Sequence, residues 1–522
     1  MSFRIALFGS PGCGKSAITS KLLEKKSEEI QWLEFSRDFL VNELNDTDGN
    51  YAKIRAEGRR IFSRISANEG ATWAADRVLT KQLQGKNTIL TGVRGISNLH
   101  KLRANGFFCI FIDCSDNRLA KRVGLRNSIT YDTALAELKK EDDFFNNDEI
   151  RSTCDYVLDN DSDNLDFAEY QLYNLCMTAS RDLVPFEIGK TCIKCTNSRK
   201  NGALFPNNSD ICSTCKSYNL ASNDDSLLKE QKDFFFSELK SAKHKGTKFL
   251  VGISGGKDST LALHQVRNET ENVEAFTIDT GYYPLTVLSR SIQVAKELET
   301  PHTIFNAREL ISPEIQASYE KSAEIYSEEP GINGPTLELY QHARDHYSVN
   351  EKIVLPYVRA CQLCRRVVIP SYYHLAKLHG AKFIVLGINE WVNLSSSSTR
   401  EGYKLSGIRK LQPDRNEAPV YVVHLPFLLG SDFKTNRDLL EKMGWQQPFN
   451  ESFVETNGNS CLFAKASEYN AFSALGFHPD STRLSREVTA GFLTKEEASR
   501  ALSMVHRTIW SVSEVLQYAK IL

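Results

Sequence analysis

The sequence predicts an α/β protein built from two doubly wound parallel-sheet domains, joined by a four-cysteine unit and followed by a helical C-terminal extension. Two regions alternate short apolar runs with amphipathic stretches, which is typical of strands and helices in a parallel sheet. In each region one apolar run leads into a glycine-rich loop, at residues 9–16 and 254–260. The four cysteines between the two regions stand in two pairs.

The changes of pattern divide the chain into four parts. We expect a first α/β domain at residues 1–183, the cysteine unit at 184–222, a second α/β domain at 223–430 and a mostly helical region at 431–522. A chain of 522 residues accommodates this division, because a domain typically takes about 100–200 residues.

The apolar runs also set the expected elements. In the first domain we expect strands at 3–8, 87–91 and 107–113, and helices at 16–28, 54–84 and 116–123. In the second domain we expect strands at 248–253, 273–278, 302–305 and 383–386.

Composition narrows the classes of partner and compartment. With 64 basic and 65 acidic residues the net charge is −1, so there is no global electrostatic case for a nucleic acid or a membrane as partner. No apolar run approaches the roughly 18 residues of a membrane span, and the first run leads into a glycine loop rather than a signal-peptide cleavage site. Twelve cysteines without a secretion signal indicate a reducing cytosol, so we expect a cytoplasmic protein.

The first loop is a Gly-x4-Gly-Lys-Ser sequence between an expected strand and an expected helix, which is the context of a phosphate loop. Its glycines let backbone amides face phosphate oxygens, and the helix N-terminus adds partial positive charge. Lys15, a candidate catalytic residue, would reach the β and γ phosphates of ATP, and the Ser16 hydroxyl would hold Mg²⁺. The expected nucleotide-binding residues here are Gly9, Gly12, Gly14, Lys15 and Ser16.

This domain resembles the small P-loop nucleotide kinases of the adenylate kinase and dephospho-coenzyme A kinase type. The resemblance implies a second phosphate-site element after a strand, where this chain has Thr91-Gly92-Val93-Arg94. It also implies lid arginines that clamp phosphoryl oxygens. Arg118, Arg122 and Arg126 are spaced by four residues, so one helix face can carry all three. A solvated helix face is the alternative interpretation.

The acceptor of this domain is not assigned by the sequence. Asp38 and Arg60 are candidate acceptor contacts, and Asp113 is a candidate metal-site acid because it ends an expected strand. A nucleotide-driven switch without kinase activity is the other interpretation of the domain.

The two cysteine pairs follow a Cys-x2-Cys-x16-Cys-x2-Cys pattern, made by Cys192, Cys195, Cys212 and Cys215. This spacing predicts a zinc site, because each pair places two thiolates on one side of a tight turn. Four thiolates leave no open coordination position, so the expected role of Zn²⁺ is structural, and we expect residues 184–222 to form a zinc ribbon. Free thiols are the alternative.

The second loop follows an apolar run and precedes an expected helix. Its glycines permit close approach of the backbone to an anion, its hydroxyls can donate to pyrophosphate, and its lysine neutralises charge. The residues concerned are Ser254, Gly255, Gly256, Lys257, Asp258, Ser259 and Thr260.

This Ser-Gly-Gly-Lys-Asp-Ser string resembles the signature of PP-loop ATP pyrophosphatases. The resemblance implies cleavage of ATP to AMP and pyrophosphate, an adenylated substrate, and a nitrogen or sulfur nucleophile that displaces AMP. It makes Lys257 and Asp258 the candidate catalytic residues. It also places Asp279, at the end of the next strand, and Gly387, after a later strand, near the nucleotide.

Within that superfamily the chain is most similar to the N-acetyl sugar amidotransferase family. A four-cysteine unit precedes the loop in that family, and residues 475–498 resemble its C-terminal helical signature. The similarity implies a sugar or other small-molecule substrate. Because no glutaminase nucleophile is recognisable in the chain, ammonia would come from a separate glutaminase.

A third cysteine set, Cys361-x2-Cys364 with Cys461, resembles that of PP-loop tRNA thiolation enzymes, where three thiolates hold a [4Fe-4S] cluster and leave one iron open for sulfide. Arg359, Arg365 and Arg366 flank the pair and are candidates to lower thiolate pKa or to bind phosphate. The alternatives are a second zinc site and unliganded thiols. The function is therefore left open between nitrogen transfer, sulfur transfer to a small molecule or tRNA, and non-catalytic nucleotide sensing.

Overall fold

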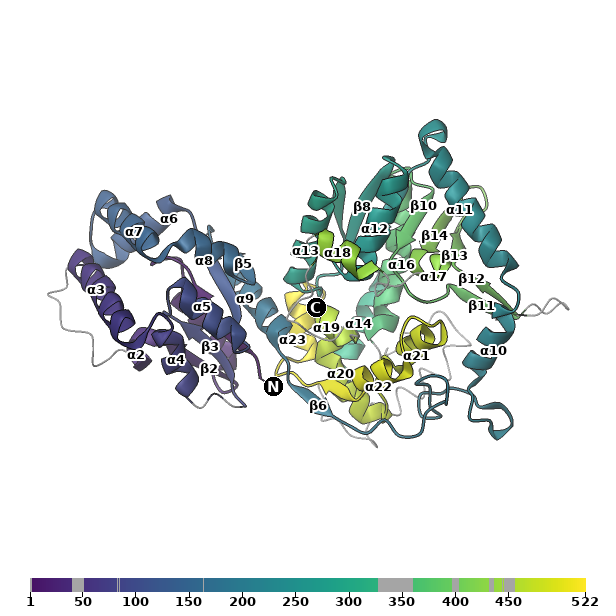
Figure 1. Ribbon diagram of the computed structural model, residues 1–522, viewed down its shortest axis with the longest axis horizontal. Coiled ribbons are helices and arrows are strands. Elements are labelled where there is room, and N and C mark those ends of the chain that lie inside the picture. Colours follow the sequence, from purple (N-terminus) through teal and green to yellow (C-terminus); the bar gives the residue numbers. More distant parts are fainter. Residues whose placement is uncertain are drawn as a thin grey trace. The chain divides into compact units, whose positions relative to one another are not determined.

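The computed structural model describes residues 2–39, 51–81, 83, 85–162, 164–326, 360–396, 403–430, 436–443, 445 and 456–522. The chain divides into two compact units, Met1–Asp182 (unit 1) and Leu183–Leu522 (unit 2). Each is an α/β unit whose sheet is flanked by helices (Figure 1). The expectation of a mixed α/β protein with parallel sheets is confirmed.

Unit 1 is built on a five-stranded parallel sheet of order β2-β3-β1-β4-β5. Its strands are β1 (Arg4–Phe8), β2 (Ile30–Glu34), β3 (Asn87–Thr91), β4 (Phe108–Asp113) and β5 (Tyr156–Asp159). Its helices are α1 (Lys15–Lys26), α2 (Phe35–Phe39), α3 (Tyr51–Glu69), α4 (Trp73–Thr80), α5 (Ile96–Ala104), α6 (Asp116–Asn127), α7 (Tyr131–Phe145), α8 (Asn147–Thr153) and α9 (Leu165–Ala179). The central strands are apolar almost throughout, because helices cover both faces of such a sheet.

Unit 2 contains a six-stranded sheet of order β13-β14-β10-β7-β8-β9. Its strands are β7 (Phe249–Gly252), β8 (Val273–Asp279), β9 (His302–Asn306), β10 (Phe383–Leu386), β13 (Ile408–Leu411) and β14 (Val420–His424), beside a hairpin of β11 (Asn393–Ser396) and β12 (Tyr403–Ser406). The helices up to the last sheet strand are α10 (Ser213–Ser222), α11 (Ser226–Lys245), α12 (Lys257–Glu269), α13 (Leu285–Glu297), α14 (Pro313–Ile325) and α16 (Ala360–Leu378). The remaining helices are α17 (Leu425–Leu429), α18 (Arg437–Lys442), α19 (Asn457–Ser460), α20 (Leu462–Leu475), α21 (Ser481–Thr489), α22 (Lys495–Leu502) and α23 (Val512–Tyr518).

The structure differs from the sequence expectations in four places. The helix expected at 54–84 is two helices, α3 and α4, because Gly70 lies between them with φ of +94°. The sheet of unit 2 is not purely parallel, since β13 pairs antiparallel with β14 at its edge. The C-terminal region includes a strand, β15 (Met504–His506), which pairs antiparallel with β6 (Leu183–Pro185). Residues 186–222 contain no strand, so the cysteine unit is two loops and α10 rather than a β-ribbon.

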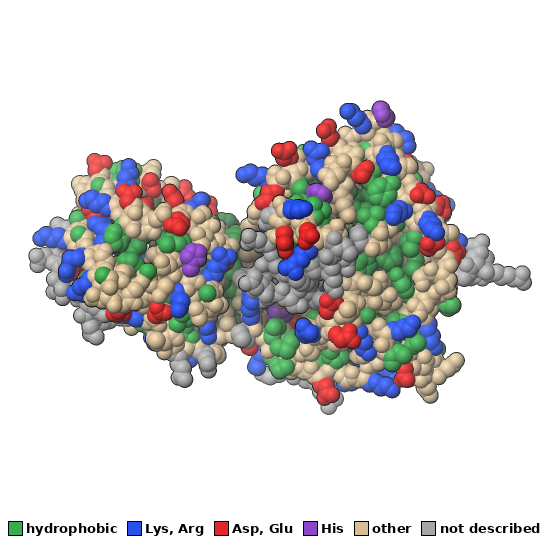
Figure 2. Space-filling model, viewed as in Figure 1, with side chains coloured by type: hydrophobic (Ala, Val, Ile, Leu, Met, Phe, Trp, Pro, Cys, Tyr) green, Lys and Arg blue, Asp and Glu red, His purple; other side chains and the backbone are tan. Residues whose placement is uncertain are grey.

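No described helix is both long and apolar enough to pass through a bilayer. On the face shown in Figure 2, acidic and basic side chains are interspersed over both units. This distribution agrees with the near-zero net charge.

Candidate active sites

The first loop connects β1 to α1 at the carboxyl edge of the unit 1 sheet. β1 lies between β3 and β4, so the loop leaves the sheet where the strand order reverses, the usual ligand position in open α/β sheets. Gly14 has φ of +99°, and a Cβ there would lie 2.4 Å from the Asn160 amide nitrogen. That amide donates to the Cys13 carbonyl across 2.7 Å and fixes the loop from the far side. A glycine is therefore required at position 14.

Lys15 folds back into its own loop. Its Nζ donates to the Gly9 carbonyl at 2.6 Å and the Ser10 carbonyl at 3.1 Å, and lies 3.2 Å from the Cys13 sulfur. Burial lowers the pKa of the Lys15 amine, and the neighbouring guanidinium of Arg94 lowers it further. A bound phosphate would supply the negative charge that this amine lacks.

A pocket of about 720 Å³ opens over the first loop. Of the residues expected in this site, Gly12, Gly14, Lys15, Ser16, Arg94, Arg122 and Arg126 line it. Arg122 is held by a 2.9 Å hydrogen bond to the Ser162 carbonyl. Arg94 pairs with the buried carboxylate of Glu141, so its guanidinium is oriented along the pocket wall. The structure thus brings Arg94, Arg122 and Arg126 together with the loop, whereas Arg118 does not line the pocket and lies 3.5 Å from Asp161.

Three other candidates from the sequence do not line this pocket, and their roles stay predictions. Arg60 pairs with Glu57 on the surface of α3 and does not line the pocket. Asp38 accepts a hydrogen bond from the Glu34 amide, so its carboxylate is used within the chain. Asp113 forms an ion pair with Arg151 at 2.7 Å.

The residues that sequence analysis missed precede Arg60 on α3, by five residues and by one residue. Arg55 and Arg59 line the pocket from α3, and Arg59 pairs with Glu137 at 3.2 Å and Glu141 at 2.8 Å. The four-residue spacing within each pair places both arginines, and both glutamates, on one helix face. Arg60 and Arg64 have the same spacing, so the sequence alone does not single out Arg55 and Arg59. The Nε of Arg55 is buried and has no hydrogen-bond partner, so a ligand group could occupy that position.

The second loop leaves the sheet of unit 2 at its own reversal of strand order, because β7 lies between β10 and β8. Ser259 closes the loop: its hydroxyl donates to the Gly256 carbonyl at 3.0 Å and accepts from the Ser254 amide at 3.2 Å. Gly255 has φ of +69°, and a Cβ there would lie 2.5 Å from the Cβ of Arg290. The Gly256 amide donates to the Ser254 hydroxyl at 3.4 Å, so both backbone groups of Gly256 form hydrogen bonds within the loop. Helix α12 begins directly after it, at Lys257.

Two charged side chains stand at the start of α12. Lys257 Nζ lies 2.8 Å from Asp258 Oδ2, and Asn389 donates to the same oxygen at 3.2 Å. A Cβ on Gly387 would lie 2.5 Å from the Ser259 nitrogen, so the end of β10 touches the backbone of this first turn. Gly387 therefore acts through close packing, which the sequence did not reveal. The hydroxyl of Thr260 is buried without a hydrogen-bond partner.

Asp279 ends β8 at the same edge of the sheet. One carboxylate oxygen accepts from the Gly281 amide at 2.8 Å, and the other lies 3.4 Å from Arg308. Arg308 also donates to the Ala519 carbonyl at 2.9 Å, so the C-terminal segment closes over this position. Asp279 is at the edge that the resemblance implied, with its carboxylate already partnered.

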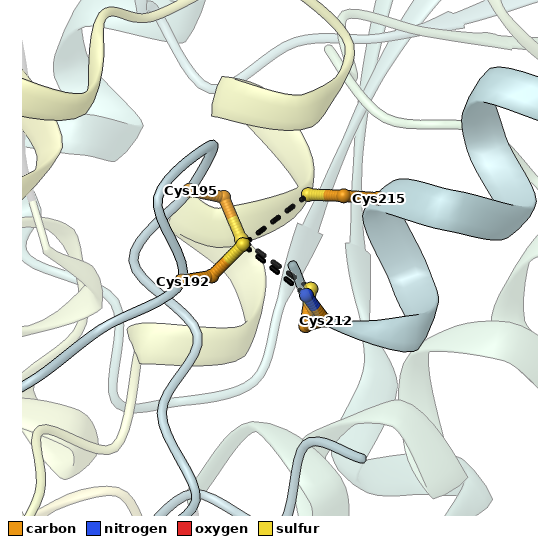
Figure 3. A group of neighbouring side chains, drawn as sticks. All are labelled: Cys192, Cys195, Cys212 and Cys215. Atoms are coloured by element: carbon orange, nitrogen blue, oxygen red, sulfur yellow. Dashed lines mark hydrogen bonds between the residues drawn. The ribbon is translucent and has the colours of Figure 1, made fainter. Parts of the chain in front are cut away.

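The four cysteines of the zinc pattern converge in one buried cluster (Figure 3). Cys192 and Cys215 have sulfurs 4.0 Å apart, and Cys195 and Cys212 have sulfurs 3.7 Å apart. Tetrahedral Zn²⁺ with Zn–S bonds of about 2.3 Å requires sulfurs about 3.8 Å apart. The side chains present therefore fit a closed four-thiolate metal site.

The cysteine cluster is also bound to α21. Thr196 and Ser485 share a 2.9 Å hydrogen bond between hydroxyls, and the Cys215 sulfur lies 3.3 Å from the Thr489 hydroxyl. From α22, Lys495 donates to the Cys192 carbonyl at 2.6 Å. Metal binding at the cysteines would consequently fix the position of α21.

The third cysteine set lies near the second loop but is less closely gathered. Cys361 and Cys364 are on α16, and Cys461 caps α20, where its sulfur accepts from the Ala464 amide at 3.5 Å. Among described residues, the sulfurs of these cysteines do not form a group within 4.8 Å of one another. Burial, and next the neighbouring Asp480, raise the pKa of the Cys361 thiol. Metal or cluster binding here stays a prediction, and Arg359 lies outside the described residues.

A second group of potential ligands consists of Glu468, His478 and Asp480. His478 Nδ1 accepts from the Asp480 amide at 3.0 Å, so in the neutral ring Nε2 carries the proton. That nitrogen lies 3.4 Å from Glu468, and burial lowers the pKa of His478 to about 4. This Nε2 is buried and has no hydrogen-bond partner among the described residues. Metal-binding histidines normally donate from the nitrogen that does not hold the metal, whereas His478 Nδ1 accepts, so this geometry disfavours a metal at Nε2.

The strand order and the first loop define unit 1 as an α/β unit with a phosphate-type loop at its reversal of strand order, beneath a pocket. No protein-family model matches the chain. The chain is similar to the uncharacterized protein MJ1599 of Methanocaldococcus jannaschii, with 21% identity over 268 residues that make up 51% of this chain and 76% of that protein.

Three solved structures resemble part of the chain. An uncharacterized protein from Eubacterium ventriosum is 16% identical, with a TM-score of 0.25, and the match covers 34% of this chain and 98% of that one. TT1252 from Thermus thermophilus is 19% identical, with a TM-score of 0.24 and coverage of 33% and 96%. Shikimate kinase from Bacteroides thetaiotaomicron is 12% identical, with a TM-score of 0.22 and coverage of 33% and 97%. At these TM-scores the class rests on the strand order and loop of unit 1.

Proposed function

We propose that unit 2 is a PP-loop ATP pyrophosphatase that cleaves ATP to AMP and pyrophosphate and so adenylates a carbonyl group of its substrate. The observation that supports this most is the placement of the Ser254–Thr260 loop at the strand-order reversal of the sheet, with α12 starting at Lys257. Amides and a helix N-terminus at such a point favour an anion.

The chemistry asked of the protein is positioning and charge neutralisation. Negative charge grows on the leaving pyrophosphate as the α-phosphate is transferred, and Lys257 and the loop amides would offset it. Asp258 orients Lys257 through their 2.8 Å contact. Mg²⁺ would neutralise further phosphate charge when bound.

For the second step we propose transfer of nitrogen, with ammonia from a separate glutaminase, as in the N-acetyl sugar amidotransferase family. The attachment of the cysteine unit to α21 supports this, because both features belong to that resemblance. Sulfur transfer is the second candidate, favoured by the presence of Cys361, Cys364 and Cys461 beside the same sheet edge.

The two candidates differ in their metal content. Anaerobically purified protein with one zinc per chain and no absorbance near 400 nm would agree with nitrogen transfer. An absorbance shoulder at roughly 400 nm that is lost in the Cys361→Ser variant would favour the sulfur-transfer candidate. Two zinc equivalents per chain would indicate a second zinc at the third cysteine set and would exclude an iron–sulfur cluster there.

The primary test is the appearance of AMP and pyrophosphate from ATP. Hydrolysis to ADP and phosphate alone would contradict the proposal.

For unit 1 we propose a kinase-like phosphoryl transfer, supported by the pocket in which Lys15, Arg94 and Arg122 meet. A nucleotide switch without transfer is the alternative, and formation of a phosphorylated acceptor would exclude it.

A further inference from the structure

A second large pocket, of about 1080 Å³, lies in unit 2. Its walls come from α14, α16, α19, α20 and α21, so chain segments from residue 312 to residue 483 meet around it. Of the candidate site residues from the sequence, Cys361 is one that lines it. Pockets of this size in enzymes commonly bind small molecules.

The wall of this pocket carries three arginines: Arg365 and Arg366 from α16 and Arg483 from α21. Arg483 is anchored between Asp480 at 3.5 Å and Glu487 at 2.6 Å. Arg365 reaches Glu390 only at 3.7 Å, and its side chain is 63% exposed. Arginines present planar donor pairs that match carboxylate and phosphate groups.

Two carboxyl groups on the opposite side differ in charge. Glu468 is buried, accepts a 2.6 Å hydrogen bond from the His506 amide, and has its pKa raised by burial to about 8, so it is mostly protonated at pH 7. Asp480 is held by the amide and side chain of Asn457. Burial opposes its ionisation, but Arg483 outweighs it and the pKa of Asp480 is lowered.

The rest of the described lining mixes polar and apolar side chains. Asn457, Ser467 and Thr482 contribute amide and hydroxyl groups, Ile315, Ile369 and Pro370 contribute apolar surface, and the lining residues that the structure describes include no aromatic ring. The described part of this wall can therefore hydrogen-bond hydroxyls and presents no ring on which a base could stack.

The pocket is joined to the second loop by a chain of charged contacts. Arg483 binds Glu487, whose pKa is affected by the charges of Lys257 and Asp258. In addition, Arg365 lies 3.7 Å and Arg486 lies 3.3 Å from Glu390, which comes three residues after Gly387. A molecule in the pocket would therefore lie beside the loop.

We propose that this pocket binds the substrate activated at the second loop, and that this substrate is a small, hydroxyl-rich, non-aromatic anion whose carboxylate or phosphate is held by Arg365 and Arg366. The proposal rests on the pyrophosphatase function of unit 2 and names the class of its substrate. It holds for either nucleophile, since Cys361 shares the pocket wall.

The test uses the full chain and glucose 6-phosphate as probe, with glucose as the neutral control and a 5′-phosphorylated RNA dinucleotide as the aromatic anion. Binding is measured by isothermal titration calorimetry. We expect the sugar phosphate to bind, and glucose and the dinucleotide to bind at least tenfold more weakly. Arg365→Gln with Arg366→Gln should weaken sugar phosphate binding at least tenfold, while Lys377→Gln, at the far end of α16, should not change it.

Three outcomes would overturn the proposal: no binding of the sugar phosphate, equal binding of glucose, or tighter binding of the dinucleotide. The comparison among ligands uses the unmodified chain, so it remains decisive if the double variant does not fold. Arg366→Lys, which keeps the charge, should retain more affinity than the double variant. Pyrophosphate release from ATP is measured separately: binding without ATP cleavage would contradict the proposed function alone, and cleavage without binding would contradict this inference alone.

Discussion

The side-chain amide of Asn389 donates to the Asp258 carboxylate across 3.2 Å and ties the loop after β10 to the first turn of α12. The same carboxylate oxygen lies 2.8 Å from Lys257 Nζ. One carboxylate therefore holds a cation and joins the two strands on either side of the strand-order reversal. This contact ranks Asp258 above the hydroxyls of the loop as the residue to test first.

Asp258→Ala should lower pyrophosphate release from ATP by about 10²- to 10³-fold, the usual effect of losing one charge-orienting group. Lys257 would lose its partner and Asn389 its acceptor. Lys15→Ala, in the other unit, should retain the release, which would assign the activity to the second loop. Equal loss in both variants would contradict that assignment.

Gly387→Ala should damage the same activity through packing alone. Its Cβ would lie 2.5 Å from backbone atoms of Asp258 and Ser259, which cannot move without shifting the start of α12. We expect a destabilisation of about 1–3 kcal/mol together with a raised KM for ATP. Thermal unfolding and steady-state kinetics measure the two effects, and a variant with wild-type KM would show that the turn tolerates displacement.

Removal of the metal from the cysteine cluster should disturb the second loop, because the cluster is hydrogen-bonded to α21. Cys212→Ser should lose one zinc equivalent, lower the unfolding temperature and reduce pyrophosphate release, because α21 carries Arg486 and Glu487 toward the sheet edge. Metal analysis, calorimetry and the release assay check these effects. Cys176→Ser, a buried cysteine of unit 1, is the control and should keep its metal. A Cys212→Ser chain with full zinc content would contradict the site.

Much of the architecture could be predicted because it is local. The apolar run of β1, its glycines and the polar start of α1 are adjacent in sequence, and the cysteine spacing contains its own geometry. The choice between Arg59 and Arg60 could not be made, because it depends on how α3 is rotated against its neighbours. The pocket around Glu468 could not be predicted either, because segments separated by more than a hundred residues must meet to form it.

Glu468 should make the stability of unit 2 depend on pH. Its pKa is about 8 when folded and about 4.5 in an ordinary environment, so the unfolded chain releases this proton first. The contribution of Glu468 to the free energy of unfolding is thus fully present below about pH 4.5 and is lost as the pH rises toward 8. The upper limit of this contribution is about 5 kcal/mol.

Glu468→Gln removes this titration while keeping the shape. The free energy of unfolding of the variant should fall less steeply between pH 5 and 8 than that of the wild type, measured by denaturant titration. His478, with a pKa of about 4, acts in the other direction below pH 6.5 in both proteins, so the difference between them isolates Glu468. Parallel pH profiles would show that Glu468 is ionised in the folded chain.

Gly14→Ala should remove one of two nucleotide sites. The added Cβ would lie 2.4 Å from the Asn160 amide nitrogen and break its 2.7 Å hydrogen bond to the Cys13 carbonyl, which shapes the first loop. Because φ at this position is +99°, alanine is strained even if Asn160 moves. With a non-hydrolysable ATP analogue, calorimetry should give two sites per wild-type chain and one per variant chain, while pyrophosphate release from ATP stays unchanged. A wild-type chain with a single site abolished by Gly14→Ala would mean that the second loop does not bind ATP, and the proposed function of unit 2 would fall with it.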